Sequence, residues 1–316
     1  MGELYDLIIA GAGPAGLTAA IYARRAELKV LLIEKNYISG GQIINTYEID
    51  NYPGLPGLSG MDLATKMSEH VDKYETERLT AEIQRLDLAG DIKKIETDKG
   101  IFEAKSVILA SGNSPSKLGV KGEEELTGMG VSYCATCDGA FFRNRTVAVV
   151  GGGDVAVEDA IFLARGCKKV YVIHRRNELR AAKTLQTALF ACDNVEMVWD
   201  SVVTEISGKD NVEKVAVSNV KDNSTSELEV NGVFIAVGNI PNNLYVPGGR
   251  DKDALKEGEL LLDAKGYVVA GEDCATNIPG VYAAGDIRSK ALRQVSTAVA
   301  DGANAVYAIE KYLVGA

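Results

Sequence analysis

The sequence predicts an α/β protein with two Rossmann-like dinucleotide-binding domains, each arranged as a three-layer ββα unit. A glycine-rich turn between a strand and a helix occurs twice, at residues 11–16 and 151–156. The surrounding segments align without a gap when the first is shifted by 140 positions. The chain of 316 residues is also longer than most single domains, so duplication of one domain explains both its length and its repeat.

The first glycine turn follows a short apolar run at residues 6–10, which is typical of a buried parallel strand. After the turn, a helix and a second strand are expected over residues 17–27 and 29–33. In this setting Gly11 permits the tight turn, Gly13 lets the backbone approach a pyrophosphate, and Gly16 allows close packing of the helix on the strand. The helix N-terminus then faces the phosphates with its partial positive charge.

The second unit repeats this order. A strand, a helix and a strand are expected over residues 147–150, 157–165 and 170–173. Gly151 and Gly153 align with Gly11 and Gly13. A further repeat follows each unit, because residues 107–115 match residues 233–241, and both come after a hairpin-like stretch with a turn near 98–100 or 222–225.

The two units differ where each second strand ends. Glu34 lies 18 residues after Gly16, where a carboxylate can accept hydrogen bonds from a ribose diol. His174 takes the place of Glu34 in the second unit, and Arg175, Arg176 and Arg180 follow it. Guanidinium groups suit a 2′-phosphate. The first unit is therefore expected to bind FAD and the second NADPH; alternatively, the arginines are a solvated helix start and His174 only shapes the turn.

Cys134 and Cys137 are separated by two residues and followed by Asp138. In a chain without a secretory signal such a pair indicates a redox couple. A zinc half-site is the alternative, but zinc normally takes four ligands, and the sequence has no second close Cys pair or His pair. We expect no metal. The other cysteines, Cys167, Cys192 and Cys274, suit a reducing cytoplasm.

The rest of the chain completes the first domain. An amphipathic helix is expected within residues 60–78, and residues 278–286 form a strand that ends in Gly285 and Asp286. A helix over residues 293–312 follows, whose N-terminus could lie near a flavin ring. The first domain is thus discontinuous. The expected boundaries give residues 1–115 with 246–316 to the FAD domain, and residues 116–245 to the NADPH domain.

Composition excludes several other functions. The net charge of −10 argues against a broad nucleic-acid-binding surface. No apolar run is long enough to cross a bilayer, and the acidic first residues differ from a signal peptide. A cytoplasmic protein without nucleic-acid or membrane partners is expected.

Seven segments together closely resemble the low-molecular-weight, NADPH-dependent thioredoxin reductases of bacteria and plants. They are GAGPAG, GGQ, SYCATCDGAFF, VVGGGDVAVEDA, HRRNELRA, AVGNIPN and VYAAGD with RQV. The resemblance covers the whole chain. It implies the fold of the FAD/NAD(P)-linked disulfide oxidoreductases and a homodimer. It also implies that NADPH gives hydride to FAD, that FAD reduces the Cys134–Cys137 disulfide, and that the dithiol reduces thioredoxin. The cysteine pair and the NADPH site share the second domain, so rotation between the domains is expected if both compete for one face of the flavin.

The resemblance also assigns residues. Cys134 would attack the thioredoxin disulfide, Cys137 would face the flavin, and Asp138 would supply a proton. The FAD contacts would be Gly11, Gly13, Pro14, Ala15, Gly16, Glu34, Gly40, Gly41, Gln42, Asn51, Gly112, Gly285, Asp286, Arg293, Gln294 and Val295. The NADPH contacts would be Gly151, Gly153, Asp154, Val155, Ala156, His174, Arg175, Arg176 and Arg180.

Two residues depart from the family pattern. Asn239 stands where many members have His, and Ser111 replaces a usual Thr. Neither change removes a charge that the mechanism needs. The alternatives are a reductase of a glutaredoxin-like or peroxiredoxin partner, a ferredoxin-dependent relative, or a flavin-binding redox sensor without turnover.

Overall fold

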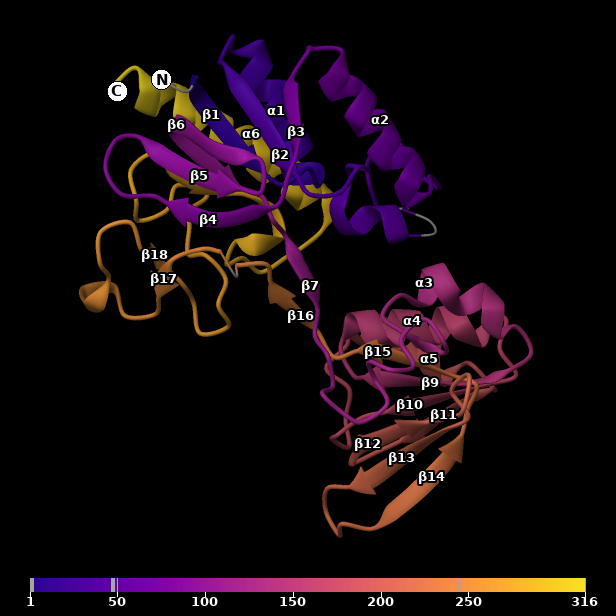
Figure 1. The fold of residues 1–316 in the computed structure, drawn as a ribbon. Helices are drawn as coiled ribbons and strands as arrows, with labels where there is room; N and C mark the ends of the chain where they lie inside the picture. Colours follow the sequence, from indigo (N-terminus) through magenta and orange to yellow (C-terminus); the bar gives the residue numbers. More distant parts are fainter. Residues whose placement is uncertain (1–2, 47–48, 50, 244, 316) are drawn as a thin grey trace. The chain divides into compact units, whose positions relative to one another are not determined.

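The computed structural model describes residues 3–46, 49, 51–243 and 245–315. The chain divides into two compact units, Met1–Ser114 with Ile240–Ala316, and Pro115–Asn239 (Figure 1). The second boundary lies at residues 239 and 240, rather than at the predicted 245 and 246. The following residues stay with the first unit because Ser111 Oγ donates to the Asn242 carbonyl at 2.8 Å, and Asn242 Nδ2 donates to the Ser111 carbonyl at 2.9 Å.

The first unit contains a seven-stranded sheet of mixed direction. Its main order is β3-β2-β1-β6-β5-β4, and β19 also pairs with β6. The strands are β1 (Leu4–Ala10), β2 (Val30–Glu34), β3 (Glu77–Thr80), β4 (Ile83–Asp87), β5 (Lys93–Thr97), β6 (Gly100–Leu109) and β19 (Val281–Ala283). The start of β6 pairs antiparallel with β5 and its end pairs parallel with β19. The C-terminal segment thus completes the sheet that the N-terminus begins.

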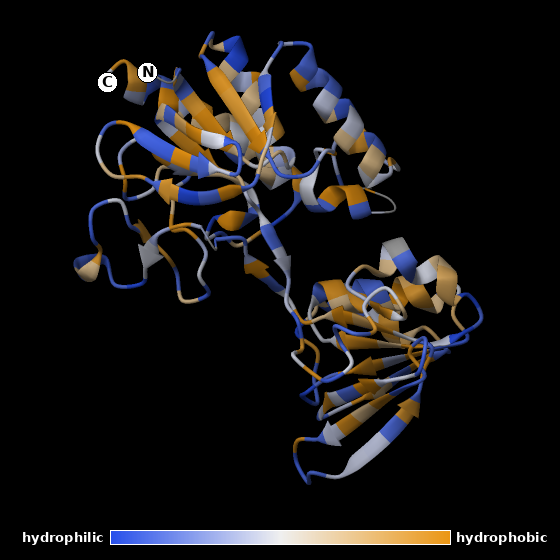
Figure 2. Cartoon of the chain, viewed as in Figure 1, coloured by the Kyte–Doolittle hydropathy of each residue, from blue (hydrophilic) through white to orange (hydrophobic). Residues whose placement is uncertain are grey.

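Both faces of this sheet are covered, which explains the apolar runs in its strands (Figure 2). Leu7 and Ile9 of β1 pack in the core formed with helices α1 (Pro14–Arg25) and α6 (Val295–Leu313). Ile8 alternates with them and packs in a second core with residues of β4 and β5. The three-layer prediction is confirmed in this unit.

Helix α2 (Gly60–Asp72) lies within the predicted range of residues 60–78. Glu75 has a φ of +49°, which ends the helical path. Residues 77–80 then form β3, which pairs parallel with β2. The end of the range, residues 77 and 78, is therefore part of a strand, because β2 supplies backbone partners there. The short 3₁₀ turns of this unit are η1 (Gly41–Asn45), η3 (Lys252–Ala254) and η4 (Gly285–Ile287), and its small ribbon pairs β17 (Gly248–Gly249) with β18 (Leu260–Leu261).

The second unit repeats the arrangement with a parallel sheet of order β11-β10-β9-β15-β8. These strands are β8 (Val131–Ser132), β9 (Thr146–Gly151), β10 (Lys169–Ile173), β11 (Val195–Val198) and β15 (Gly232–Ala236). The helices are α3 (Ala135–Asp138), α4 (Asp154–Ala164) and α5 (Lys183–Phe190), with η2 (Gly139–Phe142). A separate antiparallel sheet contains β12 (Ser201–Ser207), β13 (Lys214–Asn219) and β14 (Thr225–Glu229). Val149 packs on the side of α4, and Val150 packs on the side of β12 and β13.

The two crossings between the units pair with each other. β7 (Asn113–Pro115) and β16 (Asn239–Pro241) form a two-stranded ribbon. These strands are the last three residues of the two copies of the second sequence repeat. Of the described residues, none belongs to a helix that is long and apolar enough to cross a membrane.

Candidate functional site: two glycine turns and a cysteine pair

One glycine in each turn is required by packing. Gly11 has a φ of +111°, and a Cβ atom there would lie 2.5 Å from the Ala110 carbonyl oxygen. Gly151 has a φ of +154°, and its Cβ atom would lie 2.3 Å from the Ala236 carbonyl oxygen. The two turns thus lie close to equivalent carbonyl groups at the ends of β6 and β15. The fold alone accounts for glycine at these positions.

The third residue of each turn is a glycine that the fold does not require. Gly13 has a φ of −75°, and the nearest atom to its Cβ position is Gly41 Cα at 4.0 Å. Gly153 has a φ of −94°, and among the described residues no atom lies within 4 Å of its Cβ position. An alanine would fit both places. Glycine at a position where alanine would fit suggests that a ligand approaches the backbone closely there.

These bare glycines also begin the helices. Gly13 is the N-cap of α1 and Gly153 the N-cap of α4, and no described side chain caps either end. The first amide groups of both helices therefore lack a capping oxygen at the positive end of the helix dipole. A phosphate can accept hydrogen bonds from these amide groups, and its negative charge suits the positive end of the dipole. Both turns fit a dinucleotide pyrophosphate.

Glu34 lies beside the first turn, as predicted for a ribose ligand. Its Oε2 accepts the Ala12 N–H at 2.9 Å, and its Oε1 accepts the backbone and side-chain N–H groups of Asn36 at 3.0 and 3.1 Å. A carboxylate offers about four lone-pair positions. The three contacts fix the carboxylate and leave Oε2 able to accept one hydroxyl.

Several predicted FAD residues from distant parts of the chain meet in the first unit. A Cβ atom on Gly41 would lie 3.2 Å from Gly13 Cα, and one on Gly285 would lie 2.9 Å from Ala15 Cβ. Asn51 Nδ2 donates to Gln294 Oε1 at 3.0 Å. Gln42, Gly112, Asp286 and Arg293 belong to the same unit. Gly41 and Gly285 therefore lie at the start of α1, and the other residues share its unit.

Three polar residues near this region have defined surroundings. Gln42 Nε2 donates to the Asn113 carbonyl at 2.8 Å and to the Asn113 side-chain oxygen. Burial raises the pKa of Asp286, even though Lys290 and Arg293 oppose the shift. Arg293 stacks over the ring of Tyr267 at 3.8 Å and donates to the Asp286 carbonyl at 3.3 Å. These contacts hold Arg293 next to the Gly285–Asp286 turn.

The second unit presents cations where the first presents Glu34. Arg175, Arg176 and Arg180 are exposed, and in the described part of the chain their side chains form no ion pair. The backbone N–H of Arg180 donates to the Gly152 carbonyl at 2.8 Å, so this arginine is fixed beside the glycine turn. Asp154 accepts the Ala182 N–H at 2.7 Å and holds the same loop.

His174 lies under the turn rather than beside it. The residue is 5% exposed, and its ring atoms would lie 2.3 to 2.7 Å from a Cβ atom on Gly152. Its ring also makes an edge contact with Trp199. Burial lowers the pKa of His174, and the arginine charges lower it further, so the ring is neutral at pH 7. These contacts favour support of the turn over direct ligand contact.

Replacing Gly153 with alanine is expected to leave folding intact but to weaken NADPH binding roughly 10- to 100-fold, because the methyl group blocks one charge-assisted contact. The matched variant Gly152→Ala should instead lower the free energy of unfolding by about 1–3 kcal/mol, since its methyl group meets His174. Thermal unfolding without nucleotide and NADPH titration separate the two effects. Equal losses of stability in both variants would refute the distinction between the glycines.

The cysteine pair lies in the second unit at the start of α3. Cys134 is half-buried and disulfide-bonded, whereas Cys167, Cys192 and Cys274 are free. The Cys134 N–H donates to Ser132 Oγ at 3.0 Å, and Asp138 N–H donates to the Cys134 carbonyl at 3.2 Å. The side chain of Cys137 lies outside what the structure describes.

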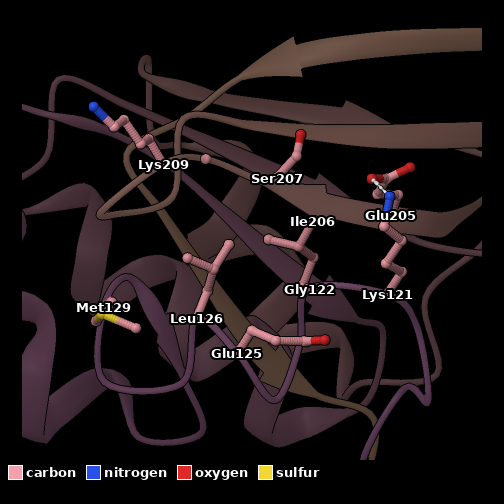
Figure 3. Close-up of a pocket in the computed structure, with 10 residues that line it drawn as sticks. Lys121, Gly122, Glu125, Leu126, Met129, Glu205, Ile206, Ser207 and Lys209 are labelled. Atoms are coloured by element: carbon pink, nitrogen blue, oxygen red, sulfur yellow. Dashed lines mark hydrogen bonds and ion pairs between the residues drawn. The ribbon is translucent and has the colours of Figure 1, made fainter.

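Sequence reasoning missed a buried ion cluster formed by Asp301, Arg288 and Lys290. Its only sequence signal is an acid at Asp301 within the alanine-rich stretch of α6. A hollow of about 380 Å³ lies elsewhere, in the second unit, between residues 121–129 and residues 205–209 (Figure 3). None of the predicted site residues lines it, so it has no part in the nucleotide sites.

The chain matches the family model of the pyridine nucleotide-disulphide oxidoreductases over residues 5–302. It is 44% identical to the thioredoxin reductase of Peptoclostridium acidaminophilum, over 99% of this chain and 98% of that relative. The structure resembles the crystal structure of Lactococcus lactis thioredoxin reductase with a TM-score of 0.88 and 42% identity, covering 99% of this chain and 100% of the other.

A more distant structure is a ferredoxin-flavin thioredoxin reductase from Clostridium acetobutylicum, with a TM-score of 0.53, 31% identity and 99% coverage of both chains. The resemblance to thioredoxin reductases and the predicted fold class are confirmed. The family uses flavin and pyridine nucleotides, which agrees with the two glycine turns. The chain belongs to the pyridine nucleotide-disulphide oxidoreductase family, and its similarity over nearly its whole length is to members named thioredoxin reductase.

Proposed function

We propose that the protein is an NADPH-dependent thioredoxin-disulfide reductase that binds FAD in its first unit and NADPH in its second. The observation that supports this best is the pair of bare glycines, Gly13 and Gly153, with a carboxylate beside one and cations beside the other. The same fold is thus specialised twice, for a ribose with a free 2′-hydroxyl and for a ribose with a 2′-phosphate.

Residues of the first unit would contact each part of FAD. The bare turn at Gly13 would bind the pyrophosphate and Glu34 the adenosine ribose. The residues that gather with them, Gly41, Asn51, Asp286 and Gln294, would bind the rest of the cofactor. Each of these belongs to a segment that a hydrogen bond or close contact holds in place.

The second unit favours NADPH over NADH and over ferredoxin. A ferredoxin-dependent enzyme would need neither the bare Gly153 nor exposed guanidinium groups at the end of β10. Arg175, Arg176 and Arg180 provide charge-assisted donors for a 2′-phosphate, for which NADH has no group. The three arginines are therefore the specificity-determining residues that we assign to this site.

When bound, NADPH and FAD would supply the two electrons that reduce the disulfide of Cys134, which we pair with Cys137. The chain's own residues then act on the partner. The Cys134 thiolate attacks the thioredoxin disulfide and forms a mixed disulfide, and the second partner sulfur leaves as a thiol after protonation by Asp138. Attack by Cys137 on Cys134 releases reduced thioredoxin and restores the starting disulfide.

We further propose that the two units rotate about the β7–β16 ribbon during the cycle, since one flavin must serve both NADPH and the cysteine pair. A cross-link that locks the ribbon should permit a single electron-transfer step and stop turnover. Full steady-state activity in an enzyme whose cross-link is verified would contradict the rotation. A homodimer in the cytoplasm completes the proposal, and the free thiols fit such a reducing compartment.

The test is steady-state oxidation of NADPH by the purified chain, with a visible spectrum taken first for bound flavin. Oxidation should require oxidised thioredoxin and should be much slower with NADH. Glutaredoxin, a peroxiredoxin and reduced ferredoxin serve as alternative partners. A colourless protein that cannot be reconstituted with FAD would end the proposal, and turnover with ferredoxin alone would replace NADPH as the donor.

A further inference from the structure

A buried ion cluster lies on helix α6, and its centre is Asp301. Asp301 is buried, and only 3% of the residue is exposed. Arg288 donates to it through Nη2 at 2.8 Å and Nε at 3.3 Å, and Lys290 Nζ donates to Oδ2 at 2.8 Å. The side chains of Arg288 and Lys290 are only 13% and 7% exposed. One acid thus faces two cations in a region shielded from solvent.

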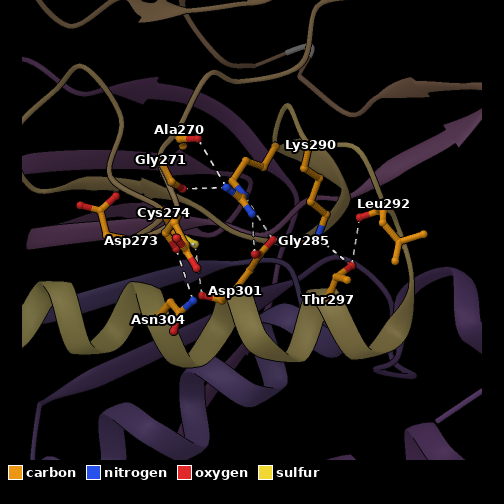
Figure 4. Close-up of polar contacts among 12 residues, drawn as sticks. Ala270, Gly271, Asp273, Cys274, Gly285, Lys290, Leu292, Thr297, Asp301 and Asn304 are labelled. Atoms are coloured by element: carbon orange, nitrogen blue, oxygen red, sulfur yellow. Dashed lines mark hydrogen bonds and ion pairs between the residues drawn. The ribbon is translucent and has the colours of Figure 1, made fainter.

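The same carboxylate holds the turn that precedes these cations. The backbone N–H of Gly285 donates to Asp301 Oδ2 at 2.9 Å (Figure 4). Asp286 is the next residue and is one of the proposed FAD ligands. Arg288 also joins the cluster to a neighbouring loop, because its Nη1 donates to the Gly271 carbonyl at 2.6 Å. The position of Asp286 therefore depends on Asp301.

The cluster also reaches the first turn of α6. Lys290 Nζ donates to Thr297 Oγ1 at 3.1 Å (Figure 4). Thr297 in turn accepts the Gln294 N–H at 3.1 Å and closes the capping box that begins the helix. Gln294 and Val295 are proposed FAD contacts. Lys290 thus links Asp301 to a second FAD-binding segment.

Gly302, the residue after Asp301, packs against a third segment, the start of α1. A Cβ atom on Gly302 would lie 2.3 Å from the Ala15 carbonyl oxygen and 3.0 Å from the Ala19 N atom. Helix α6 therefore touches the backbone of α1 next to Asp301. Ala15 belongs to the first turn of α1, which we assign to the pyrophosphate. Residues 301 and 302 therefore contact, directly or through one side chain, all three segments.

Stability alone explains this cluster poorly. Removing one acid and two cations from water is costly, and apolar side chains of similar volume are often as stabilising as a buried ion pair. The cluster has one positive charge in excess. What apolar side chains could not supply is the acceptor for the Gly285 N–H and the bridge to Thr297.

We propose that Asp301 is a positioning residue that holds the Gly285–Asp286 turn, the start of α6 and the start of α1 in the arrangement that binds FAD. The inference rests on the proposed function, because it assumes that this unit binds FAD. Asp301 need not touch the cofactor. It acts through the Gly285 amide and through Lys290.

Asp301→Asn removes the charge that pairs with two cations and keeps the size of the side chain. We expect the dissociation constant for FAD to rise about tenfold or more, measured by titrating the apoprotein and following flavin fluorescence. The matched control is Lys93→Met. Lys93 is also buried in the first unit, where its Nζ donates to the carbonyls of Leu88 and Gly90. Its loss should lower the melting temperature and leave FAD affinity within about twofold, since it lies in the β4–β5 hairpin.

The outcomes separate the inference from the proposed function. If the parent chain binds no FAD, the proposed function fails. If the parent binds FAD and Asp301→Asn raises the dissociation constant less than about fivefold, the inference alone is overturned. If the single variant does not fold, Asp301→Asn with Lys290→Met restores the original net charge of the cluster. That double variant must still lose about fivefold or more in FAD affinity, and an affinity like that of the parent overturns the inference.

Discussion

Replacing Cys134 with serine is expected to abolish the reduction of thioredoxin while leaving the reduction of the flavin by NADPH intact. Loss of a catalytic nucleophile lowers turnover by roughly three orders of magnitude or more. A serine hydroxyl at the same place cannot form the mixed disulfide with the partner. Serine differs from cysteine only in having oxygen in place of sulfur, and the residue is only half-buried at the start of α3. The substitution should therefore not disturb the fold. Steady-state assays with thioredoxin and rapid-mixing measurements of flavin absorbance report the two half-reactions separately.

Cys192→Ser is the matched control for this experiment. Cys192 is a free, partly exposed thiol of the same unit, and it donates only a weak hydrogen bond to the Ala188 carbonyl at 3.4 Å. Its replacement should leave both half-reactions unchanged. Persistent thioredoxin reduction by the Cys134 variant would mean that another thiol attacks the partner, and equal losses in both variants would indicate a general effect on folding.

Replacing Arg175 and Arg176 together with alanine is expected to weaken NADPH binding and to leave NADH binding unchanged. Each charge-assisted contact with a 2′-phosphate is worth about 1.5–3 kcal/mol. Loss of both should therefore raise the dissociation constant for NADPH by roughly two to four orders of magnitude. Since NADH has no phosphate at this place, the preference between the two nucleotides should disappear. Parallel titrations with NADPH and NADH measure this directly.

The control must remove two positive charges from the same unit at the other end of its sheet. Arg145 and Arg165 are exposed; one precedes β9 and the other follows α4. The double variant Arg145→Ala with Arg165→Ala should keep the nucleotide preference of the parent. If Arg175→Ala with Arg176→Ala keeps it as well, these arginines are only a solvated helix start, and the assignment of NADPH loses its main support.

The repeat was predictable because it depends on local patterns. A strand, a glycine turn and a helix are adjacent in the chain, so their spacing is preserved in the sequence. Both sheets contain the expected central strands, β1 with β2 and β9 with β10. The helix predicted within residues 60–78 is α2, but where it ends could not be predicted, because pairing of β3 with β2 is a tertiary contact that helical periodicity does not report.

The surroundings of each glycine could not be predicted from the sequence. The motif assigns a tight turn to Gly11 and a close backbone approach to Gly13, but it does not say which atoms lie around either position. Only the structure shows that a Cβ atom on Gly11 would lie 2.5 Å from a carbonyl oxygen, whereas the atom nearest to one on Gly13 would be Gly41 Cα at 4.0 Å. His174 is a similar case, since its sequence position suggests a ligand and its burial under Gly152 favours a support. The Asp301 cluster was missed because its partners come from a loop whose path the sequence does not reveal.

The ribbon of β7 and β16 determines how chimeric proteins must be built. The Ser116 N–H donates to the Gly238 carbonyl at 2.8 Å on one side of the ribbon, and the Asn242 N–H donates to the Gly112 carbonyl at 3.0 Å on the other. The two splice points of any grafted nucleotide-binding half are therefore bonded to each other. A graft that exchanges both strands as a matched pair keeps these bonds, whereas one that takes a single strand pairs mismatched sequences in the ribbon.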